Sequence, residues 1–167
     1  CWGPPLDDMM ASPLHPGCFD EKNQESWKRL VCVCVCVWNR TERVTKRFFT
    51  QTKIVGAGPF FIAPHHKTDR FEYRGKPVEA DVSYAFAYAG HCQIQLIQQH
   101  DHQPSIYRDM FNEGEFGLHH IARLEADYEG AKSVLDQQGF EKACELYADG
   151  VWACYYDTRS SVHCFTE

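Results

Sequence analysis

Apolar and polar residues alternate with a period of two along much of the chain, and this spacing predicts β-strands. The longest run covers residues 78–89, where Tyr84, Phe86 and Tyr88 fall on one aromatic face. Turn signals separate the runs, and Asp149-Gly150 is a strong hairpin signal. The other predicted strands are 30–38, 59–63, 92–98, 118–124, 140–147, 151–156 and 162–167.

Two segments have helical spacing instead. After Asn39 or Thr41, either of which can cap a helix, Val44, Phe48 and Phe49 form an apolar stripe. The second helix follows the cap Asp127, ends at Gly139 and has its apolar positions at Ala131, Val134 and Leu135. Residues 105–111 form a short helix or linker.

The order strand, helix, three strands therefore occurs twice, which indicates an internal repeat. Neither half can bury its sheet face alone. We expect an α+β fold of paired βαβββ modules, with a cleft between curved mixed sheets. The predicted units are an irregular N-terminal arm at 1–29, a first module with its linker at 30–112, and a second module at 113–167.

Composition limits the classes of function. Hydrophobic residues make up 44% of the 167 residues, enough for a core, and the net charge is −6. No basic patch points to nucleic acid, no apolar run approaches the ~20 residues of a membrane span, and residues 1–14 do not resemble a signal peptide. Cys32, Cys34 and Cys36 alternate with valines, and cysteines at this spacing on one strand cannot easily bridge. We therefore predict a reducing, cytoplasmic location.

The repeat also suggests a shared site. His120 lies seven residues before Asp127, and Cys32 lies seven residues before Asn39, so the two are repeat equivalents. The last strand of each half supplies Gln95 and Glu167. All four side chains can donate to a metal and are predicted to face one cleft. Imidazole and carboxylate donors together suit zinc, iron, manganese, nickel or cobalt.

Taken singly, each of these residues has a more ordinary interpretation. His119 and His120 are adjacent on one strand, so their rings should point to opposite faces, and a single such histidine is commonly packed or exposed. Gln95 fits a solvated strand face, Glu167 an exposed position, and Cys32 a small core residue. His163, on the predicted face of Glu167, either extends the polar lining or is buried. The coincidence of repeat-equivalent positions favours the metal site.

Several motifs occur in an order that resembles the glyoxalase-like branch of the vicinal-oxygen-chelate superfamily, close to methylmalonyl-CoA epimerase in the Gly-Leu-His-His segment. They are Gly58-Pro59-Phe60-Phe61, Tyr73-Arg74-Gly75, residues 93–99, residues 105–109 and Gly117-Leu118-His119-His120-Ile121-Ala122. The resemblance implies a divalent metal held by His120, Glu167 and Gln95. The family's first-strand histidine falls on Cys32, where this sequence departs from the pattern.

The resemblance implies a metal-dependent enzyme with isomerase, lyase or dioxygenase chemistry on a small oxygenated substrate, carbonyl-containing or aromatic. Its catalytic residues would be Glu167 and His120. The alternative is a metal-free protein that binds an aromatic molecule in the same cleft; a third option is an inactive member, in view of the abrupt ends at Cys1 and Glu167. The resemblance also implies a homodimer. The substrate-binding candidates are Tyr107, Arg74, His163, Tyr84 and Phe86.

Overall fold

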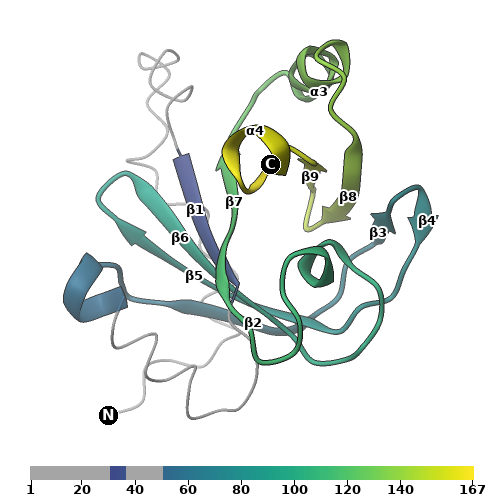
Figure 1. Ribbon diagram of the computed structural model, residues 1–167. Coiled ribbons are helices and arrows are strands. Elements are labelled where there is room, and N and C mark those ends of the chain that lie inside the picture. Colours follow the sequence, from purple (N-terminus) through teal and green to yellow (C-terminus); the bar gives the residue numbers. More distant parts are fainter. Residues whose placement is uncertain (1–30, 37–50) are drawn as a thin grey trace.

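The computed structural model describes residues 31–36 and 51–167, with side chains from residue 53 onward (Figure 1). Its strands form one ten-stranded mixed sheet in the order β2-β5-β6-β1-β7-β10-β9-β8-β3-β4. The strands are β1 (Val31–Cys36), β2 (Phe61–His66), β3 (Arg70–Tyr73), β4 (Lys76–Pro77), β5 (Val82–Ala89), β6 (Cys92–Gln99), β7 (Gly117–Arg123), β8 (Lys142–Ala148), β9 (Val151–Tyr156) and β10 (Phe165–Thr166). The helical segments are η4 (Gln51–Val55), η5 (Ile106–Asp109), α3 (Tyr128–Gln137) and α4 (Arg159–Val162).

The sheet has two halves that repeat one arrangement. In the first half β1 pairs in parallel with β6, and the antiparallel pairs β6–β5 and β5–β2 continue outward. In the second half β7 pairs in parallel with β10, followed by β9 and β8. The antiparallel pair β1–β7 joins them. The α+β fold predicted from the sequence is confirmed. The helix predicted after Asn39 or Thr41, and the arm at 1–29, lie outside the described residues.

The hairpin β3–β4 departs from the simple repeat. Its turn at Arg74 and Gly75 has positive φ at both residues, as a tight hairpin turn requires. However, β3 pairs with β8, so a segment of the first module extends the second half of the sheet. The alternation of residues 78–89 predicted a strand from Val78, but β5 begins only at Val82.

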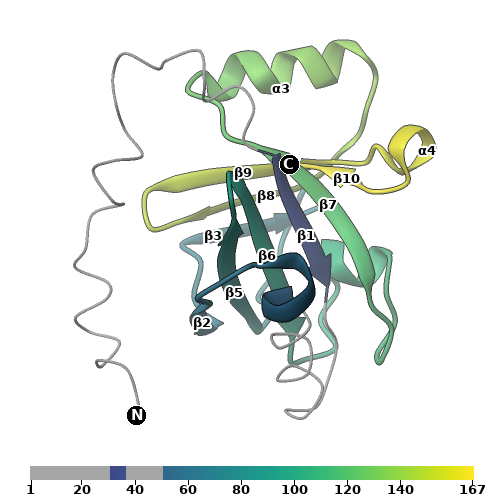
Figure 2. The same ribbon diagram turned by 90° about the vertical axis from the view of Figure 1, so that its left-hand side faces the viewer.

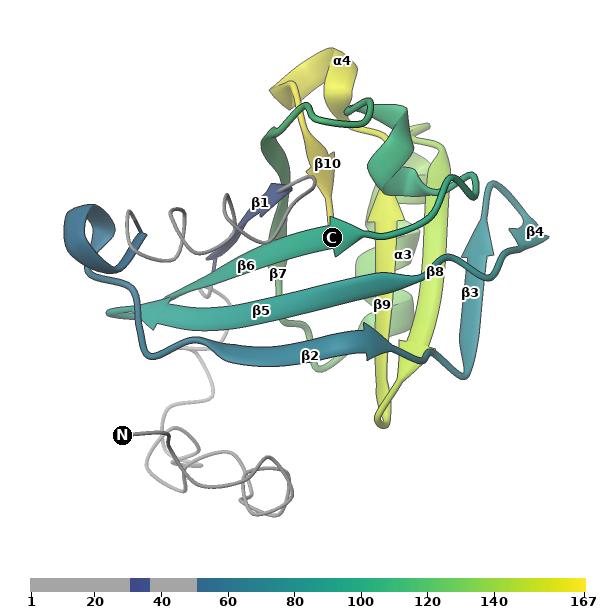
Figure 3. The same cartoon turned by 90° about the horizontal axis from the view of Figure 1, so that it is seen from below.

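The two halves pack against each other through their inner faces. The larger core cluster draws Val82, Tyr84 and Ile97 from the first half and Ala143, Cys144, Tyr155 and Phe165 from the second. Figure 3 shows β8 and β9 running crosswise to β5 and β6, near the end where β6 finishes, the arrangement that brings these faces together. A smaller alanine-rich cluster covers the opposite face of β5 and β6. No helix among the described residues is long and apolar enough to cross a membrane.

The C-terminal segment corrects one sequence expectation. Residues 162–167 were expected to form a strand, but Arg159–Val162 form the short helix α4, and the strand β10 covers only Phe165–Thr166 (Figure 2). His163 ends α4 with a left-handed backbone, φ 62°, and its side chain is exposed. His163 therefore does not share a strand face with Glu167, and the geometric reason for placing it in the site is lost.

Candidate metal centre

An irregularity between β1 and β7 sets the positions of two histidines. Cys34 pairs with His120 and Val35 pairs with Leu118, so His119 has no partner residue on β1. An extra residue of this kind interrupts the alternation of side chains along a strand. The prediction that the two rings point to opposite faces was wrong for this reason. Both rings are fully buried, and their Nδ1 atoms lie 3.0 Å apart in a hydrogen bond.

His120 meets Glu167 at the centre of the predicted site. Its Nε2 atom lies 2.7 Å from Oε2 of Glu167, whose side chain is 21% exposed. The Glu167 backbone is fixed to β7, because its N–H donates to the Ile121 carbonyl and its own carbonyl accepts from the Arg123 N–H. The sequence prediction that the imidazole of β7 and the carboxylate after β10 converge is thus matched by the geometry.

The close approach of His120 and Glu167 is not a hydrogen bond. Despite the 2.7 Å distance, His120 Nε2 has no partner in hydrogen-bonding orientation, and it is the one buried side-chain nitrogen or oxygen of the described residues in that condition. A buried polar atom without a partner is costly. A cation bound to both the ring nitrogen and the carboxylate oxygen would give this buried nitrogen a partner.

His119 occupies an aromatic pocket behind His120. Its ring centroid lies 5.0 Å from Phe165, 5.2 Å from Tyr107 and 6.4 Å from Tyr155. Its Nε2 atom hydrogen-bonds to the main-chain carbonyl of Ile106 at 3.2 Å. Burial, and to a smaller extent the neighbouring His120, lowers the pKa of His119 to about 3. His119 is therefore a neutral imidazole at physiological pH.

Gln95 lies on β6, two strands from His120. The backbone register places Cys34 of β1 between Gln95 on one side and His120 on the other. The Gln95 side chain is buried, which differs from a solvated strand face. Strands two apart in a sheet are about 10 Å apart at the backbone, a gap that two long side chains can close onto a shared ligand.

The backbone of Cys32, the sequence-predicted fourth ligand, pairs with Ala122, two residues along β7 from His120. Side chains of β1 lie outside the described residues, so the role of Cys32 stays a prediction. Among the residues whose side chains are described, no three of the types His, Cys, Asp and Glu gather closely enough to hold a metal. His120 and Glu167 fit a divalent metal by donor chemistry, and a third protein donor would have to come from an amide such as Gln95 or from β1.

The aromatic substrate candidates are part of the core beside this centre. Tyr84 and Tyr107 are buried, and their hydroxyls hydrogen-bond to each other at 3.0 Å. Burial, followed by the nearby phenol of Tyr84, raises the pKa of Tyr107 well above its ordinary value. Phe86 is half-buried, stacks on Tyr84 and pairs across the strands with Gln95. Phe86 is thus the candidate placed directly beside a predicted ligand.

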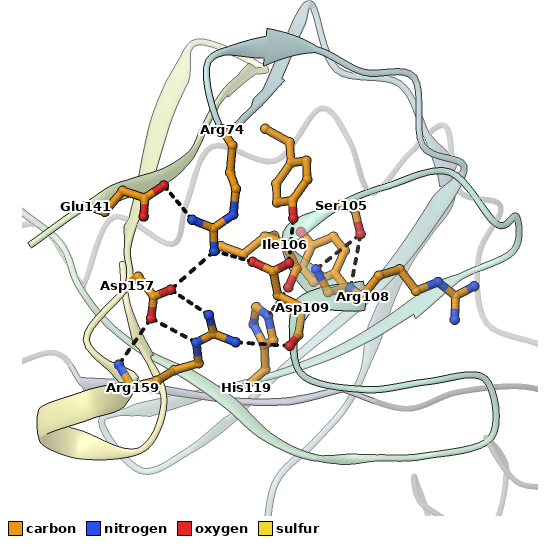
Figure 4. Close-up of polar contacts among 11 residues, drawn as sticks. Arg74, Ser105, Ile106, Arg108, Asp109, His119, Glu141, Asp157 and Arg159 are labelled. Atoms are coloured by element: carbon orange, nitrogen blue, oxygen red, sulfur yellow. Dashed lines mark hydrogen bonds and ion pairs between the residues drawn. The ribbon is translucent and has the colours of Figure 1, made fainter.

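Arg74 lies in an ion-pair network rather than at an open rim (Figure 4). Its guanidinium contacts Asp109 at 2.7 Å, Asp157 at 3.2 Å and the exposed Glu141. Burial lowers the pKa of Arg74, but hydrogen bonds with Asp109 and Glu141 outweigh it, so the net pKa is raised. The network ties the β3–β4 turn to η5 and to the segment before α4.

Arg159 connects the same network to the histidine pocket. Its guanidinium donates two hydrogen bonds to Asp157, at 2.6 and 2.8 Å, and one to the Asp109 carbonyl at 3.0 Å. Its guanidinium lies 4.7 Å from the centre of the Phe165 ring, which in turn packs on His119. Sequence reasoning missed Asp109, Asp157 and Arg159, because their contacts join segments separated by up to 83 residues.

Comparisons with known proteins agree with this architecture. Methylmalonyl-CoA epimerase from Mycobacterium tuberculosis superposes with a TM-score of 0.53 at 12% identity, covering 81% of this chain and 82% of that one. A hypothetical protein from Bacillus halodurans C-125 gives 0.52 at 16% identity, covering 83% and 90%. These likenesses show a common fold. No curated protein matches the sequence significantly.

A comparison with protein families gives a match over residues 37–156, more than half of the chain. The chain belongs to the Glyoxalase/Bleomycin resistance protein/Dioxygenase superfamily.

Proposed function

We propose that this chain is a metal-dependent enzyme of the vicinal-oxygen-chelate type, which acts on a small oxygenated substrate by isomerase, lyase or dioxygenase chemistry. One observation carries the proposal: a fully buried imidazole nitrogen without a hydrogen-bond partner, 2.7 Å from a carboxylate oxygen. Membership of a superfamily that includes dioxygenases supports it. A buried pair left in this state is typical of a site that is completed by a ligand.

The proposed ligands are His120, Glu167 and Gln95, with Cys32 as a further candidate on β1. Their nitrogen and oxygen donors suit zinc, iron, manganese, nickel or cobalt. When bound, such a metal would act as a Lewis acid on a substrate carbonyl or hydroxyl oxygen.

The residues around the proposed metal are assigned different roles. Glu167 is 21% exposed, so its carboxylate can reach a substrate atom and accept or return a proton. His120 is fully buried and is proposed to bind and orient rather than to exchange protons. The half-buried ring of Phe86, beside Gln95, is the proposed apolar contact for the substrate. Arg74 is held by three carboxylates and is not proposed to bind the substrate.

The test is metal binding by the full chain. The purified protein is stripped with a chelator and titrated by calorimetry with Zn²⁺, Mn²⁺, Co²⁺, Ni²⁺ and, without oxygen, Fe²⁺. We expect one ion per chain, and the variant His120→Ala should weaken its binding by about 100-fold or more, since it removes the imidazole ligand. The control His102→Ala, at a side chain that is 83% exposed, should bind as the wild type does.

Two outcomes would reject the proposal. Binding that persists in His120→Ala would place the metal elsewhere. A metal-free protein that binds an aromatic compound would establish the alternative function, a binding protein that holds its ligand between the two halves. The homodimer expected from the resemblance also remains a proposal, and sedimentation velocity on the same sample tests it.

A further inference from the structure

His119, the neighbour of the proposed ligand His120, has a defined set of hydrogen bonds. Both ring nitrogens of His119 have partners: Nε2 faces the Ile106 carbonyl at 3.2 Å, and Nδ1 faces Nδ1 of His120 at 3.0 Å. A carbonyl oxygen only accepts hydrogen bonds, so the proton of this contact belongs to His119 Nε2. A neutral His119 then has its lone pair on Nδ1.

The hydrogen bond between the two rings shows which of the two Nδ1 atoms bears a proton. The two Nδ1 atoms are 3.0 Å apart, so only one of them can bear a hydrogen. A proton on Nδ1 of His119 would make that ring a cation, fully buried among Phe165, Tyr107 and Tyr155. Burying a charge among apolar rings without a counter-ion is costly. The proton therefore belongs to His120 Nδ1, which donates to His119.

We propose that His119 is a positioning residue: held by the Ile106 carbonyl, it fixes His120 as the Nδ1–H tautomer and so presents the lone pair of His120 Nε2 toward Glu167. The two hydrogen bonds place a proton on His120 Nδ1, whereas the free lone pair on Nε2 and its use in metal binding rest on the function proposed above. A metal-binding histidine is commonly oriented by a hydrogen bond from its second nitrogen. Here a second histidine provides that acceptor, and a main-chain carbonyl orients the acceptor in turn.

The surroundings of Ile106 explain why its carbonyl can act as a fixed reference point. Ile106 is fully buried in η5, which begins at the capping residue Ser105, whose hydroxyl accepts from the Tyr107 N–H. The other end of η5 is held by Asp109, which accepts hydrogen bonds from Tyr73 and Arg74. The hydrogen bond between Arg74 and Asp109 (Figure 4) thereby connects the turn between β3 and β4 to the segment whose carbonyl holds His119.

Nitrogen NMR tests the tautomers directly. The full chain is labelled with ¹⁵N-histidine, stripped of metal and recorded at pH 8 through the two-bond couplings between ring nitrogens and ring protons. The signals that disappear in His120→Ala and in His119→Phe assign the two rings. We expect His120 as the Nδ1–H tautomer and His119 as the Nε2–H tautomer. His120 with its proton on Nε2, or a doubly protonated ring at either position, would overturn the proposal.

Two substitutions test the consequence for metal binding. His119→Phe keeps a ring but removes the acceptor, so Zn²⁺ binding should weaken by about 10- to 100-fold. His119→Asn returns a carbonyl oxygen near the position of Nδ1, and should restore Zn²⁺ binding to within about threefold of the wild type. Equal Zn²⁺ affinity in both variants would reject the positioning role, and the NMR result decides the tautomer even where His119→Phe fails to fold. A wild-type protein that has these tautomers but binds no metal would instead reject the proposed function.

Discussion

Two carboxylates in the second half of the sheet lie in opposite situations. Glu145 of β8 is buried beneath α3, where Tyr128, Lys132 and Lys142 donate hydrogen bonds to it at 2.9 to 3.2 Å. Glu167, after β10, approaches His120 at 2.7 Å without a hydrogen bond. A buried acid with a full set of donors stabilises the fold. Glu167 instead faces a buried ring nitrogen that has no hydrogen-bond partner. The comparison therefore separates a structural network, around Glu145, from a candidate binding site, at Glu167.

The largest effect on Zn²⁺ affinity should come from removing the charge of Glu167. Glu167→Gln keeps the shape but removes the anionic ligand, so Zn²⁺ affinity should fall by about 100-fold in a calorimetric titration. The melting temperature of the metal-free variant should stay within about 2 °C of the wild type, because the Glu167 carboxylate has no hydrogen bond to break among the side chains from residue 53 onward. A large loss of stability with unchanged Zn²⁺ binding would show that Glu167 is a structural group, as Glu145 is, and not a metal ligand.

Glu145→Gln should give the reverse result. It removes the buried anion that Lys132 and Lys142 share, and we expect a loss of about 2–3 kcal/mol in the free energy of unfolding, measured by urea denaturation. Zn²⁺ affinity should not change. Glu129→Gln is the matched control, since Glu129 also pairs with Lys132 but is 78% exposed, and it should cost less than about 0.5 kcal/mol. A similar loss in the free energy of unfolding for both variants would show that burial of the ion pair between Glu145 and Lys132 does not strengthen it.

The local part of this architecture could be predicted from sequence. The alternation around Tyr84 and the Asp149-Gly150 turn depend on neighbours in the chain, and both agree with the structure. The convergence of His120 and Glu167 was expected from the repeat and is matched by the 2.7 Å contact.

The missed features depend on contacts between distant segments. The extra residue His119 in β7 becomes visible only in its pairing with β1, and it reverses the expected direction of one ring. Arg74 looked like a substrate contact, yet its partners Asp109 and Asp157 lie 35 and 83 residues away. Helix α3 was expected to dock through an apolar stripe, but Val134 is 52% exposed and polar contacts to Glu145 provide much of its attachment.

Acid should weaken the structural network in a defined range of pH. Burial would raise the pKa of Glu145, but hydrogen bonds from Lys132, Tyr128 and Lys142 outweigh it and lower the pKa from 4.5 to about 2. Hydrogen bonds from Arg159 lower the pKa of Asp157 from 3.8 to about 2. A carboxyl group whose pKa is lower in the folded state stabilises the protein above its unfolded pKa, and this contribution is lost as the pH falls toward the folded value.

The free energy of unfolding should therefore be steady near pH 6 and fall steeply between about pH 4.5 and 2, by roughly 2 kcal/mol for each group. Urea denaturation at a series of pH values measures it. Arg70 and Glu72 of β3 also face Glu145, so the decisive comparison is with Glu145→Gln, which keeps these neighbours. The variant should show a smaller decrease in the free energy of unfolding over this range. A pH profile identical to that of the wild type would contradict the assignment of this decrease to Glu145.

The smallest effect concerns the start of α3, which holds Tyr128 and Lys132 over Glu145. The Asp127 side chain caps the helix by accepting from the Gly130 N–H at 2.9 Å, and Asp127→Ala should cost about 1 kcal/mol. A Cβ atom on Gly130 would lie 2.2 Å from Oδ2 of Asp127, so the glycine is needed only while the cap is present. Gly130→Ala should therefore destabilise the wild type but stabilise Asp127→Ala, by up to about 1 kcal/mol, because alanine favours the helix. Urea denaturation of the four proteins measures this change of sign, and the same effect of Gly130→Ala in both backgrounds would show that cap and glycine are independent.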